Sequence, residues 1–316
     1  MSWYDALRNI QSRGSQAERP GSLAGLAAAR RGHQGQFFTP DALSHLMWRV
    51  VEPAMDRAFA GGSASAPRRN RVGLFDNSVG SARLLQYADP EKHELYGVDV
   101  DAELLVEVGK VVQGAGFHCE FEPCGMEAVR ASSFDIGLIN PPFSVHLEAP
   151  TVEPFACTAY GKYGPNTSSV SHAYALAQAV DACEVVVALL PSTFAEEVAR
   201  NPTVVLGNSA RKLRALIELP PGVFREENTE VAVSILVFAY GGGLLKRYSL
   251  ANLDDPLPDL KLELYGHGGH AKLRIQGVED STPSITLPVI GDTAVRVTHN
   301  GRKIRLHFNC GLTQAK

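Results

Sequence analysis

The feature that most constrains the fold is the alternation of short apolar runs with segments of helical periodicity between residues 72 and 238. Each run is nearly continuous in apolar residues, which is typical of strands that are buried on both faces. The runs are residues 72–75, 95–98, 134–139, 185–190, 215–219 and 231–238. Helical patterns lie between some of them, at residues 104–112 and 170–180. This alternation predicts an α/β fold with an open, mostly parallel sheet and helices on both faces.

A further helix is expected before the first strand. Thr39 can cap its N-terminus, and Pro40 suits the first helical position. The apolar residues that follow recur at the spacing of one helix face, namely Leu43, Leu46, Met47, Val50 and Val51. We therefore expect the helix to begin directly after Thr39.

Length and charge exclude some classes of protein. With 316 residues, 45% of them hydrophobic, the chain can bury a substantial core. Its 30 Lys and Arg residues against 34 Asp and Glu residues give a net charge of −4. This excludes a globally basic coat for nucleic acid, but not a local basic face, because binding depends on where the charge lies.

Cysteine usage and hydropathy indicate a cytoplasmic protein. The five cysteines are odd in number and lack the paired CxxC spacing of a zinc site, so neither a disulfide framework nor a structural metal is expected. His267 and His270 lie in a glycine-rich turn without a third ligand, so we expect no metal there either. No charged-then-apolar leader begins the sequence, and its longest uncharged apolar stretch, residues 231–245, contains three glycines. We expect no membrane segment.

The two ends of the sequence differ from its centre. Residues 1–34 carry five Arg against two acidic residues, which predicts a basic arm that is mobile or depends on a partner. Residues 35–245 contain the alternating pattern and form the main predicted domain. Residues 246–316 are expected to form a small β-rich extension, with a hairpin around Asn300-Gly301. That basic hairpin is either a sheet edge kept soluble by charge or a contact with nucleic acid.

The most specific motif is Asn140-Pro141-Pro142-Phe143, which directly follows the run 134–139. Ligands of open α/β sheets bind at the carboxyl ends of strands, so this motif should border a ligand crevice. The Asn140 side-chain oxygen and the next backbone carbonyl, held rigid by proline, can accept hydrogen bonds from a planar NH2 group. They would orient the nitrogen lone pair toward an electrophile and stabilise the developing positive charge. A proline-rich strand exit without a chemical role is the alternative.

Two earlier segments have the character of a cofactor site. Residues 76–83 form a turn of small residues that is expected to lead into a helix, whose N-terminus would favour a carboxylate. Asp99 follows the second run, about 20 residues after that turn, where an acidic side chain commonly receives ribose hydroxyls. Asp101 is expected to cap the next helix.

Taken together, these motifs resemble those of the gamma-type N6-adenine DNA methyltransferases in order and spacing. The resemblance rests on Gly35-Gln36-Phe37-Phe38-Thr39-Pro40, the turn at 76–83, Asp99 and the tetrapeptide that begins at Asn140. It covers about residues 35–240. It implies a class I methyltransferase domain, which is Rossmann-like with a seven-stranded sheet, and S-adenosylmethionine as the cofactor.

The resemblance also implies roles for individual residues in cofactor binding. Phe38, Thr39 and Pro40 would lie near the methionine half of S-adenosylmethionine. Asp99 would hold the ribose. The turn would approach the cofactor closely through Asp76, Ser78, Gly80 and Ser81.

The implied target is the amino group of an adenine that has been extruded from DNA, because this group is inaccessible inside a paired stack. Asn140 and Pro141 would accept hydrogen bonds from it, in a motif completed by Pro142, and Phe143 would stack on the base. Phe224, in a later loop, would pack against the extruded base. A core phenylalanine is the alternative for Phe224.

The sequence departs from the family pattern at two places, which keeps other functions open. Ala82 stands where the family commonly has a second Gly. Cys124 stands near the place where an acidic residue is expected to contact the adenine of the cofactor, although Glu122 and Glu127 are close. These departures motivate the alternative of an inactive subunit that binds DNA or a partner. The same acceptor motif also suits the guanine amino group of ribosomal RNA or a protein glutamine. About 70 residues follow the main domain, so we expect target choice to be relaxed or to come from a specificity or restriction subunit.

Overall fold

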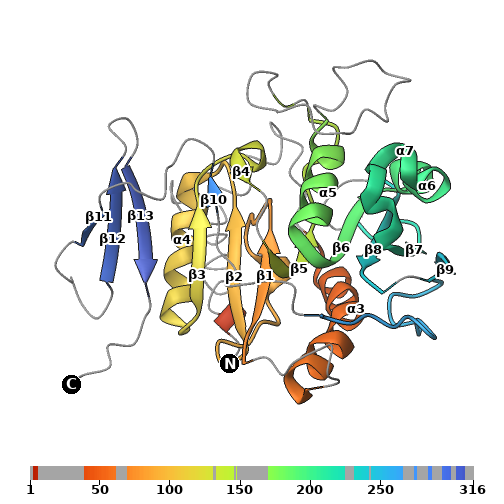
Figure 1. The fold of residues 1–316 in the computed structure, drawn as a ribbon, viewed down its shortest axis with the longest axis horizontal. Helices are drawn as coiled ribbons and strands as arrows, with labels where there is room; N and C mark the ends of the chain where they lie inside the picture. Colours follow the sequence, from red (N-terminus) through yellow and green to blue (C-terminus); the bar gives the residue numbers. More distant parts are fainter. Residues whose placement is uncertain are drawn as a thin grey trace.

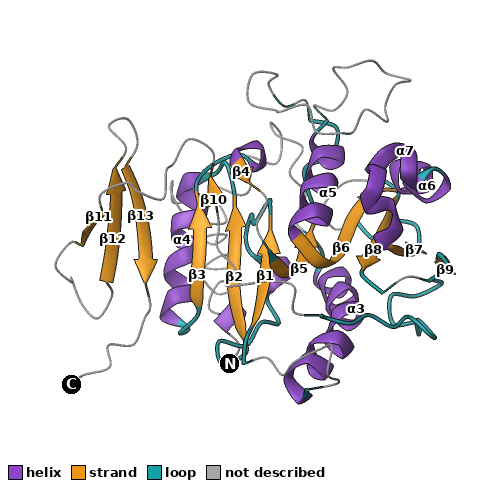
Figure 2. Ribbon diagram, viewed as in Figure 1, coloured by secondary structure: helices purple, strands orange, loops and turns teal. Residues whose placement is uncertain are grey.

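The computed structural model describes residues 3–5, 39–61, 70–130, 133–145, 147, 170–224, 231–241 and 243–265, together with four short strands beyond residue 265. Its centre is a twisted sheet covered by helices (Figures 1 and 2). Within the described ranges, no helix combines the length and the apolar character that crossing a bilayer requires.

The central sheet has eight strands in the order β3-β2-β1-β5-β6-β8-β7-β9. All neighbouring pairs are parallel except those of β8, which runs antiparallel to both β6 and β7. The strands are β1 (Val72–Asp76), β2 (His93–Val98), β3 (His118–Glu122), β5 (Phe134–Ile139), β6 (Cys183–Pro191), β7 (Leu213–Glu218), β8 (Val233–Ala239) and β9 (Lys246–Ser249). The predicted open, mostly parallel α/β sheet is therefore confirmed, with one strand, β9, added to the expected seven.

Alternate residues of the central strands enter two separate cores, which explains why their sequences are continuously apolar. In β6, Val185, Val187 and Leu189 belong to one core, whereas Val186, Ala188 and Leu190 belong to the other. The first core includes side chains of α3 (Asp41–Ala60) and α4 (Ala102–Gly114). The second includes side chains of α5 (Ser171–Ala182) and α6 (Ser192–Arg200), which α7 (Pro202–Leu206) follows. Helices thus cover both faces of the sheet, as predicted.

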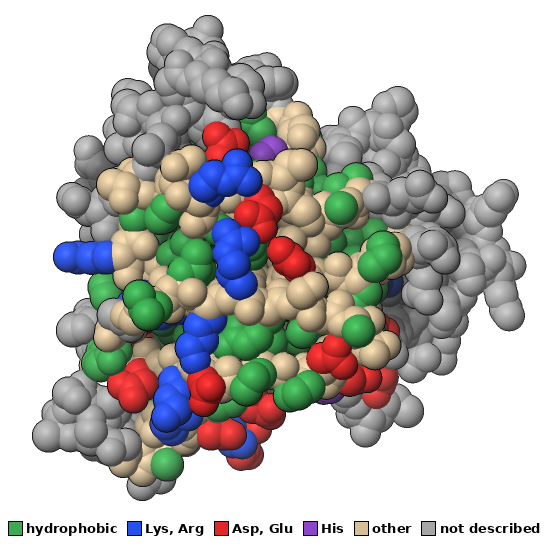
Figure 3. All heavy atoms as spheres, turned by 90° about the vertical axis from the view of Figure 1, so that its right-hand side faces the viewer, with side chains coloured by type: hydrophobic (Ala, Val, Ile, Leu, Met, Phe, Trp, Pro, Cys, Tyr) green, Lys and Arg blue, Asp and Glu red, His purple; other side chains and the backbone are tan. Residues whose placement is uncertain are grey.

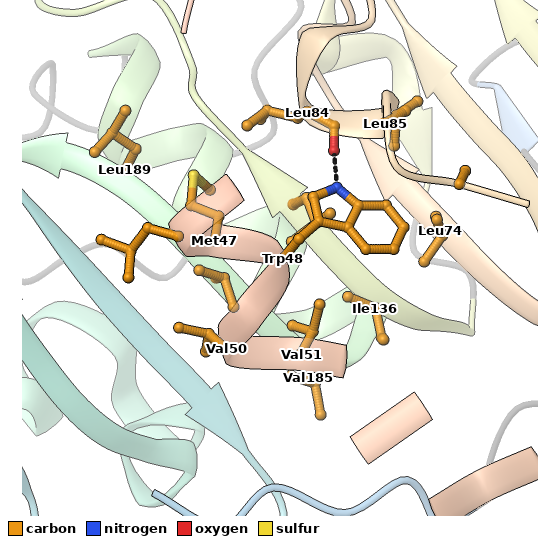
Figure 4. Close-up of a cluster of buried hydrophobic side chains, with 14 of the residues drawn as sticks. Met47, Trp48, Val50, Val51, Leu74, Leu84, Leu85, Ile136, Val185 and Leu189 are labelled. Atoms are coloured by element: carbon orange, nitrogen blue, oxygen red, sulfur yellow. Dashed lines mark hydrogen bonds between the residues drawn. The ribbon is translucent and has the colours of Figure 1, made fainter. Parts of the chain in front are cut away.

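Helix α3 packs on the sheet through its apolar face (Figure 4). Trp48 and Val51 lie among Leu74 and Ile136 of neighbouring strands. The Trp48 ring is also anchored by its Nε1, which donates to the backbone carbonyl of Leu84 at 2.5 Å. The carbonyl belongs to the turn after β1, so this contact connects α3 to the edge of the sheet where the candidate active site lies.

The start of α3 differs from the expectation in its capping. The helix begins at Asp41 with Pro40 at the N-cap position, and no side chain caps it. Thr39 is buried and directs its hydroxyl elsewhere, as described below. For α4 the expectation is confirmed, because Asp101 is the N-cap and accepts a hydrogen bond from the Leu104 backbone nitrogen at 3.0 Å.

The segment after residue 245 begins as part of the central sheet. Strand β9 pairs with β7, and Leu250, Leu262 and Leu264 are buried in the first core. The face near β9 carries positive and negative side chains interspersed rather than a patch of one sign (Figure 3). Arg247 of β9 pairs with Glu196 at 2.8 Å. The domain boundary at 245 remains a prediction.

The extreme C-terminal strands form small antiparallel pairs. Strand β12 (Ala294–His299) pairs with β13 (Ile304–Asn309), which confirms the expected hairpin, and β11 (Ser284–Thr286) pairs with β12. The expected turn at Asn300-Gly301 lies outside the described residues. Strand β10 (Arg274–Ile275) pairs with β4 (Val129–Arg130).

Of the predicted N-terminal arm, the structure describes residues 3–5, and these contact the folded domain. Tyr4 is buried in the first core. Trp3 packs edge-on against Phe117 and donates a hydrogen bond from Nε1 to the Ala88 carbonyl at 3.1 Å. The beginning of the chain is thus attached to the domain, and the rest of the arm lies outside the described residues.

Candidate active site

A cavity of about 410 Å³ lies at the carboxyl ends of β1, β2 and β5. Parallel strands end at the same edge of a sheet, so the turns that follow them meet there. Most of the site residues expected from the sequence line this cavity: Thr39, Asp76, Ser78, Gly80, Ser81, Asp99, Asn140, Pro141, Pro142 and Phe143.

Of the other three expected site residues, two are described, and neither lines the cavity. Phe38 lies outside the described residues. Pro40 is buried at the start of α3. Phe224 is 1% exposed and belongs to the first core, which agrees with the alternative interpretation of this residue as a core phenylalanine.

Asp99 organises the wall of the cavity between β1 and β2. One oxygen of its carboxylate accepts a hydrogen bond from the Gly80 backbone nitrogen at 2.7 Å, and the other accepts from the Asp101 backbone nitrogen at 2.8 Å. Gly80 has a positive φ of 50°, which glycine adopts without a steric penalty. Asp99 is therefore held in one position relative to the turn after β1.

Asp76 lies at the base of the same wall and is fully buried at the end of β1. Burial raises the pKa of its carboxyl from 3.8 to about 7, the Ser78 backbone hydrogen bond opposes this rise, and the nearby Asp99 charge adds to it. The Ser78 backbone nitrogen donates to Asp76 Oδ1 at 2.9 Å. A buried carboxyl with a pKa near 7 has a charge that depends on what occupies the cavity beside it.

The turn after β1 does not lead into an α-helix, so this expectation was wrong. It continues as a three-residue 3-10 turn, Arg83–Leu85. Ala82 precedes it with φ 58° and ψ 26°, the left-handed conformation that glycine adopts most easily. This is the position where the family that the sequence resembles commonly has a Gly. A turn this short does not provide the extended helix dipole that was expected to receive a carboxylate.

Asn140 connects three segments of the cavity wall. Its side-chain nitrogen donates to Thr39 Oγ1 at 2.9 Å, and its backbone carbonyl accepts from Ser78 Oγ at 3.2 Å. The contact to Thr39 orients the amide, because the nitrogen and the oxygen lie on opposite branches of the planar group. Asn140 is half-buried and lines the cavity.

The turn after Asn140 is held by the first two residues of α5, which no sequence motif indicated. Ser171 Oγ donates to the Pro142 carbonyl at 2.5 Å and accepts from the Val145 backbone nitrogen at 3.2 Å. Nδ1 of His172 accepts from the Ser144 backbone nitrogen at 3.0 Å, and Ser144 has a positive φ of 58°. Burial lowers the pKa of His172 to about 4, so the ring is neutral and can accept this bond.

A second network connects the turn after β1 to α5. The Asn77 side-chain nitrogen donates to the Ala175 carbonyl at 3.0 Å and to Gln178 Oε1 at 3.1 Å. The Gln178 nitrogen in turn donates to the Met126 carbonyl at 2.5 Å. In the described part of the chain, two buried polar atoms of residues that line the cavity have no hydrogen-bond partner, namely Asn77 Oδ1 and Ser81 Oγ.

The far end of the cavity is formed by residues after β3. Cys124, Gly125, Met126 and Glu127 line it. The Glu127 carboxylate lies so close to Gly125 that an added Cβ there would be 2.2 Å from Glu127 Oε1. An acidic side chain is therefore present at this end, three positions after Cys124, whereas Glu122 is buried in β3.

The fold is that of the class I S-adenosylmethionine-dependent methyltransferases. The structure is similar to a proposed enzyme of this class from Listeria monocytogenes, with a TM-score of 0.52 and 16% identity over 74% of each chain. A chain of a type I restriction–modification system matches with a TM-score of 0.41 and 16% identity, over 71% of this chain and 46% of that chain. A proposed RNA methyltransferase from Pyrococcus horikoshii matches with a TM-score of 0.40 and 15% identity, over 65% and 87%. The sequence matches no protein-family model and no curated protein.

Proposed function

We propose that this protein transfers the methyl group of S-adenosylmethionine to the N6 amino group of adenine in DNA. The observation that carries the proposal is the orientation of Asn140 at the carboxyl end of β5. Its amide nitrogen donates a hydrogen bond to Thr39. Its oxygen, on the other branch of the amide, would therefore be the acceptor for an incoming NH2 group. Asn140 lines the same cavity as Asp99 and Gly80.

The cavity fits S-adenosylmethionine in size and in chemistry. Its volume of about 410 Å³ lies within the range of small-molecule and cofactor sites. Asp99 would hold the ribose, since a carboxylate has about four lone-pair sites and can accept further hydrogen bonds beside those from Gly80 and Asp101. Glu127 would receive the adenine amino group of the cofactor. Ser81 Oγ, a buried polar atom without a partner, would gain one from the methionine half.

When bound, S-adenosylmethionine supplies an electrophilic methyl group. The protein's own part in the reaction is to bind and orient the acceptor amine. Asn140 Oδ1 and the Pro141 carbonyl would accept its two hydrogens, which directs the nitrogen lone pair toward the methyl group. As the nitrogen becomes positive, the same two oxygens stabilise the charge. The amine loses its proton afterwards, so no general base is needed before the transfer.

Phe143 would hold the extruded base. Its ring is half-buried, packs against the first core and lines the cavity next to Asn140. An aromatic ring can stack on any base, and extrusion is required because the amino group is inaccessible inside a duplex. The clamp formed by Ser171 and His172 positions the backbone on either side of this ring.

The preference for DNA rests on the resemblance of the segment that ends at Thr39-Pro40, so the test must include other planar amines. Labelled S-adenosylmethionine is incubated with duplex DNA, ribosomal RNA and a glutamine-bearing release factor, and label in each is counted. We expect label in DNA, lowered at least about 100-fold by Asn140→Ala. Asn201→Ala, the same change at an exposed residue beside α6, is the matched control. Label only in RNA or protein would overturn the DNA assignment, and S-adenosylmethionine binding without any transfer would favour an inactive subunit.

A further inference from the structure

Arg83 supplies the positive charge of the cavity wall. Among the described residues that line the cavity, the charged side chains are Asp76, Asp99, Glu127 and Arg83, so three are acidic and one is basic. Arg83 is half-buried and begins the 3-10 turn after β1. Its charge therefore lies in a partly enclosed, predominantly acidic site, where electrostatic interactions are stronger than at an open surface.

The position of Arg83 is determined by contacts at both ends of the residue. Its Nη1 donates to the Thr39 carbonyl at 3.1 Å, and its own carbonyl accepts from Ser44 Oγ of α3 at 2.8 Å. Thr39 in turn holds the Asn140 amide. The guanidinium thus lies on the Thr39 side of the cavity, close to the centre where methyl transfer is proposed.

The charges of the wall are complementary to those of S-adenosylmethionine. This molecule has two cationic groups, the sulfonium and the α-ammonium, and one anionic group, the α-carboxylate. A carboxylate that enters an acidic, partly enclosed site loses its hydration. This loss is not compensated unless the carboxylate gains a positively charged partner. The helix N-terminus expected to receive it is replaced by the 3-10 turn, and Arg83 is the one cationic side chain among the described residues that line the cavity.

We propose that the Arg83 guanidinium binds the α-carboxylate of the methionine half, and that this contact makes the site specific for a carboxylate-bearing cofactor. The inference rests on the proposed function, because it assigns one end of the same cofactor. A guanidinium has five N–H donors, so holding the Thr39 carbonyl is compatible with a paired contact to a carboxylate. Arg83 then connects the cofactor, through Thr39, to the amide of Asn140.

The test compares two ligands that differ only in this carboxylate. Dissociation constants of S-adenosylmethionine and of its decarboxylated form are measured by calorimetry for the full chain and for Arg83→Gln and Arg83→Lys. Arg71→Gln is the matched control, because Arg71 pairs with Glu94 outside the cavity. We expect Arg83→Gln to weaken S-adenosylmethionine binding by about 10-fold to 100-fold, and to change binding of the decarboxylated ligand by no more than about 2-fold.

The other possible outcomes would contradict the role proposed for Arg83 or the proposed function. Equal weakening for both ligands, or the same weakening by Arg71→Gln, would overturn the inference and leave the proposed function intact. The wild-type protein must itself prefer S-adenosylmethionine over the decarboxylated form by about the same 10-fold to 100-fold. The absence of that preference would overturn the inference even if the Arg83 variants did not fold. No binding of either ligand by the wild type would overturn both proposals.

Discussion

The side-chain nitrogen of Asn140 donates a hydrogen bond to Thr39 Oγ1 at 2.9 Å, although the two residues are 101 positions apart in the sequence. One follows β5 and the other precedes α3. The bond places the residue proposed to bind the target amine in contact with the segment proposed to lie beside the cofactor. It also explains why Thr39 does not cap α3, since its hydroxyl is engaged at the site.

Removing the Thr39 hydroxyl should impair catalysis more than folding. The variant Thr39→Val keeps the shape of the side chain but leaves the Asn140 amide without its acceptor. We expect kcat to fall by about 10-fold, which corresponds to the loss of one hydrogen bond that orients a reacting group. Thr39→Ser retains the hydroxyl and should keep most of the activity. Equal losses in the two variants, measured by steady-state methylation, would exclude the orienting role.

Ser171 should contribute to both stability and rate, because its hydroxyl binds the turn on both sides of Phe143. With Ser171→Ala, the Pro142 carbonyl and the Val145 nitrogen lose their partner. We expect a loss of about 1–3 kcal/mol in the free energy of unfolding, together with a lower kcat. Ser192→Ala is the matched control, since Ser192 begins α6 and pairs with Ser234 outside the cavity. A fall in kcat of similar size in both variants would show that the effect is not specific to the hydrogen bonds between Ser171 and the turn.

Asp76 should make folding less favourable as the pH rises. Its pKa is about 7 in the folded protein and near 3.8 when exposed, so the folded state holds a proton that the unfolded chain has released. Stability contributed by this group therefore falls between about pH 4 and pH 7. We expect the Tm gain of Asp76→Asn over the wild type to be larger at pH 8 than at pH 5. A gain that is the same at both pH values would contradict the assigned pKa.

The same variant should bind S-adenosylmethionine more weakly, because an ionised Asp76 attracts a cationic ligand. At pH 8 we expect a loss of about 10-fold in affinity for Asp76→Asn. In the wild type, binding near pH 7 should release protons, since a nearby cation lowers the pKa of the carboxyl. Calorimetry in buffers of different ionisation enthalpy measures this release. Binding without proton release, together with an unchanged affinity of Asp76→Asn, would show that Asp76 does not act on the bound cofactor.

Ala82 can be tested as a position of backbone strain. Its left-handed conformation costs about 1–2 kcal/mol, which Ala82→Gly would relieve. Loss of one buried methyl group and the greater freedom of glycine in the unfolded chain offset this gain. We therefore expect Ala82→Gly to lie within about 1 kcal/mol of the wild type in urea denaturation. Ala82→Val should destabilise by about 2 kcal/mol or more, because a β-branched side chain is added at a fully buried, strained position. Equal stability of the two variants would argue against strain.

The sheet was predictable where its strands are buried on both faces. Strand β6 is the clearest case, because its residues from Val185 to Leu190 all lie in one of the two cores. Strand β3 was absent from the expected apolar runs, since it is an edge strand whose His118, Glu120 and Phe121 are only partly buried. Strand β9, at the other edge of the sheet, was absent from the expected apolar runs for the same reason.

The site was predictable to the extent that its residues follow strands. Asp99 and Asn140 come directly after β2 and β5, and the carboxyl ends of parallel strands meet. Ser171, His172 and Gln178 act from a helix that is distant in sequence, so no local pattern pointed to them. The left-handed conformation of Ala82, which precedes the 3-10 turn, is also not indicated by the residue type.

Methyl transfer to the N6 amino group of adenine can be tested by analysing the nucleosides of DNA after incubation with the protein and S-adenosylmethionine. Mass spectrometry of the digested DNA distinguishes N6-methyladenine from other methylated bases. We expect N6-methyladenine with the wild type and with Asn201→Ala, and a yield at least about 100-fold lower with Asn140→Ala. Equal yields from the wild type and Asn140→Ala, or methyl groups on a base other than adenine, would contradict the proposed function.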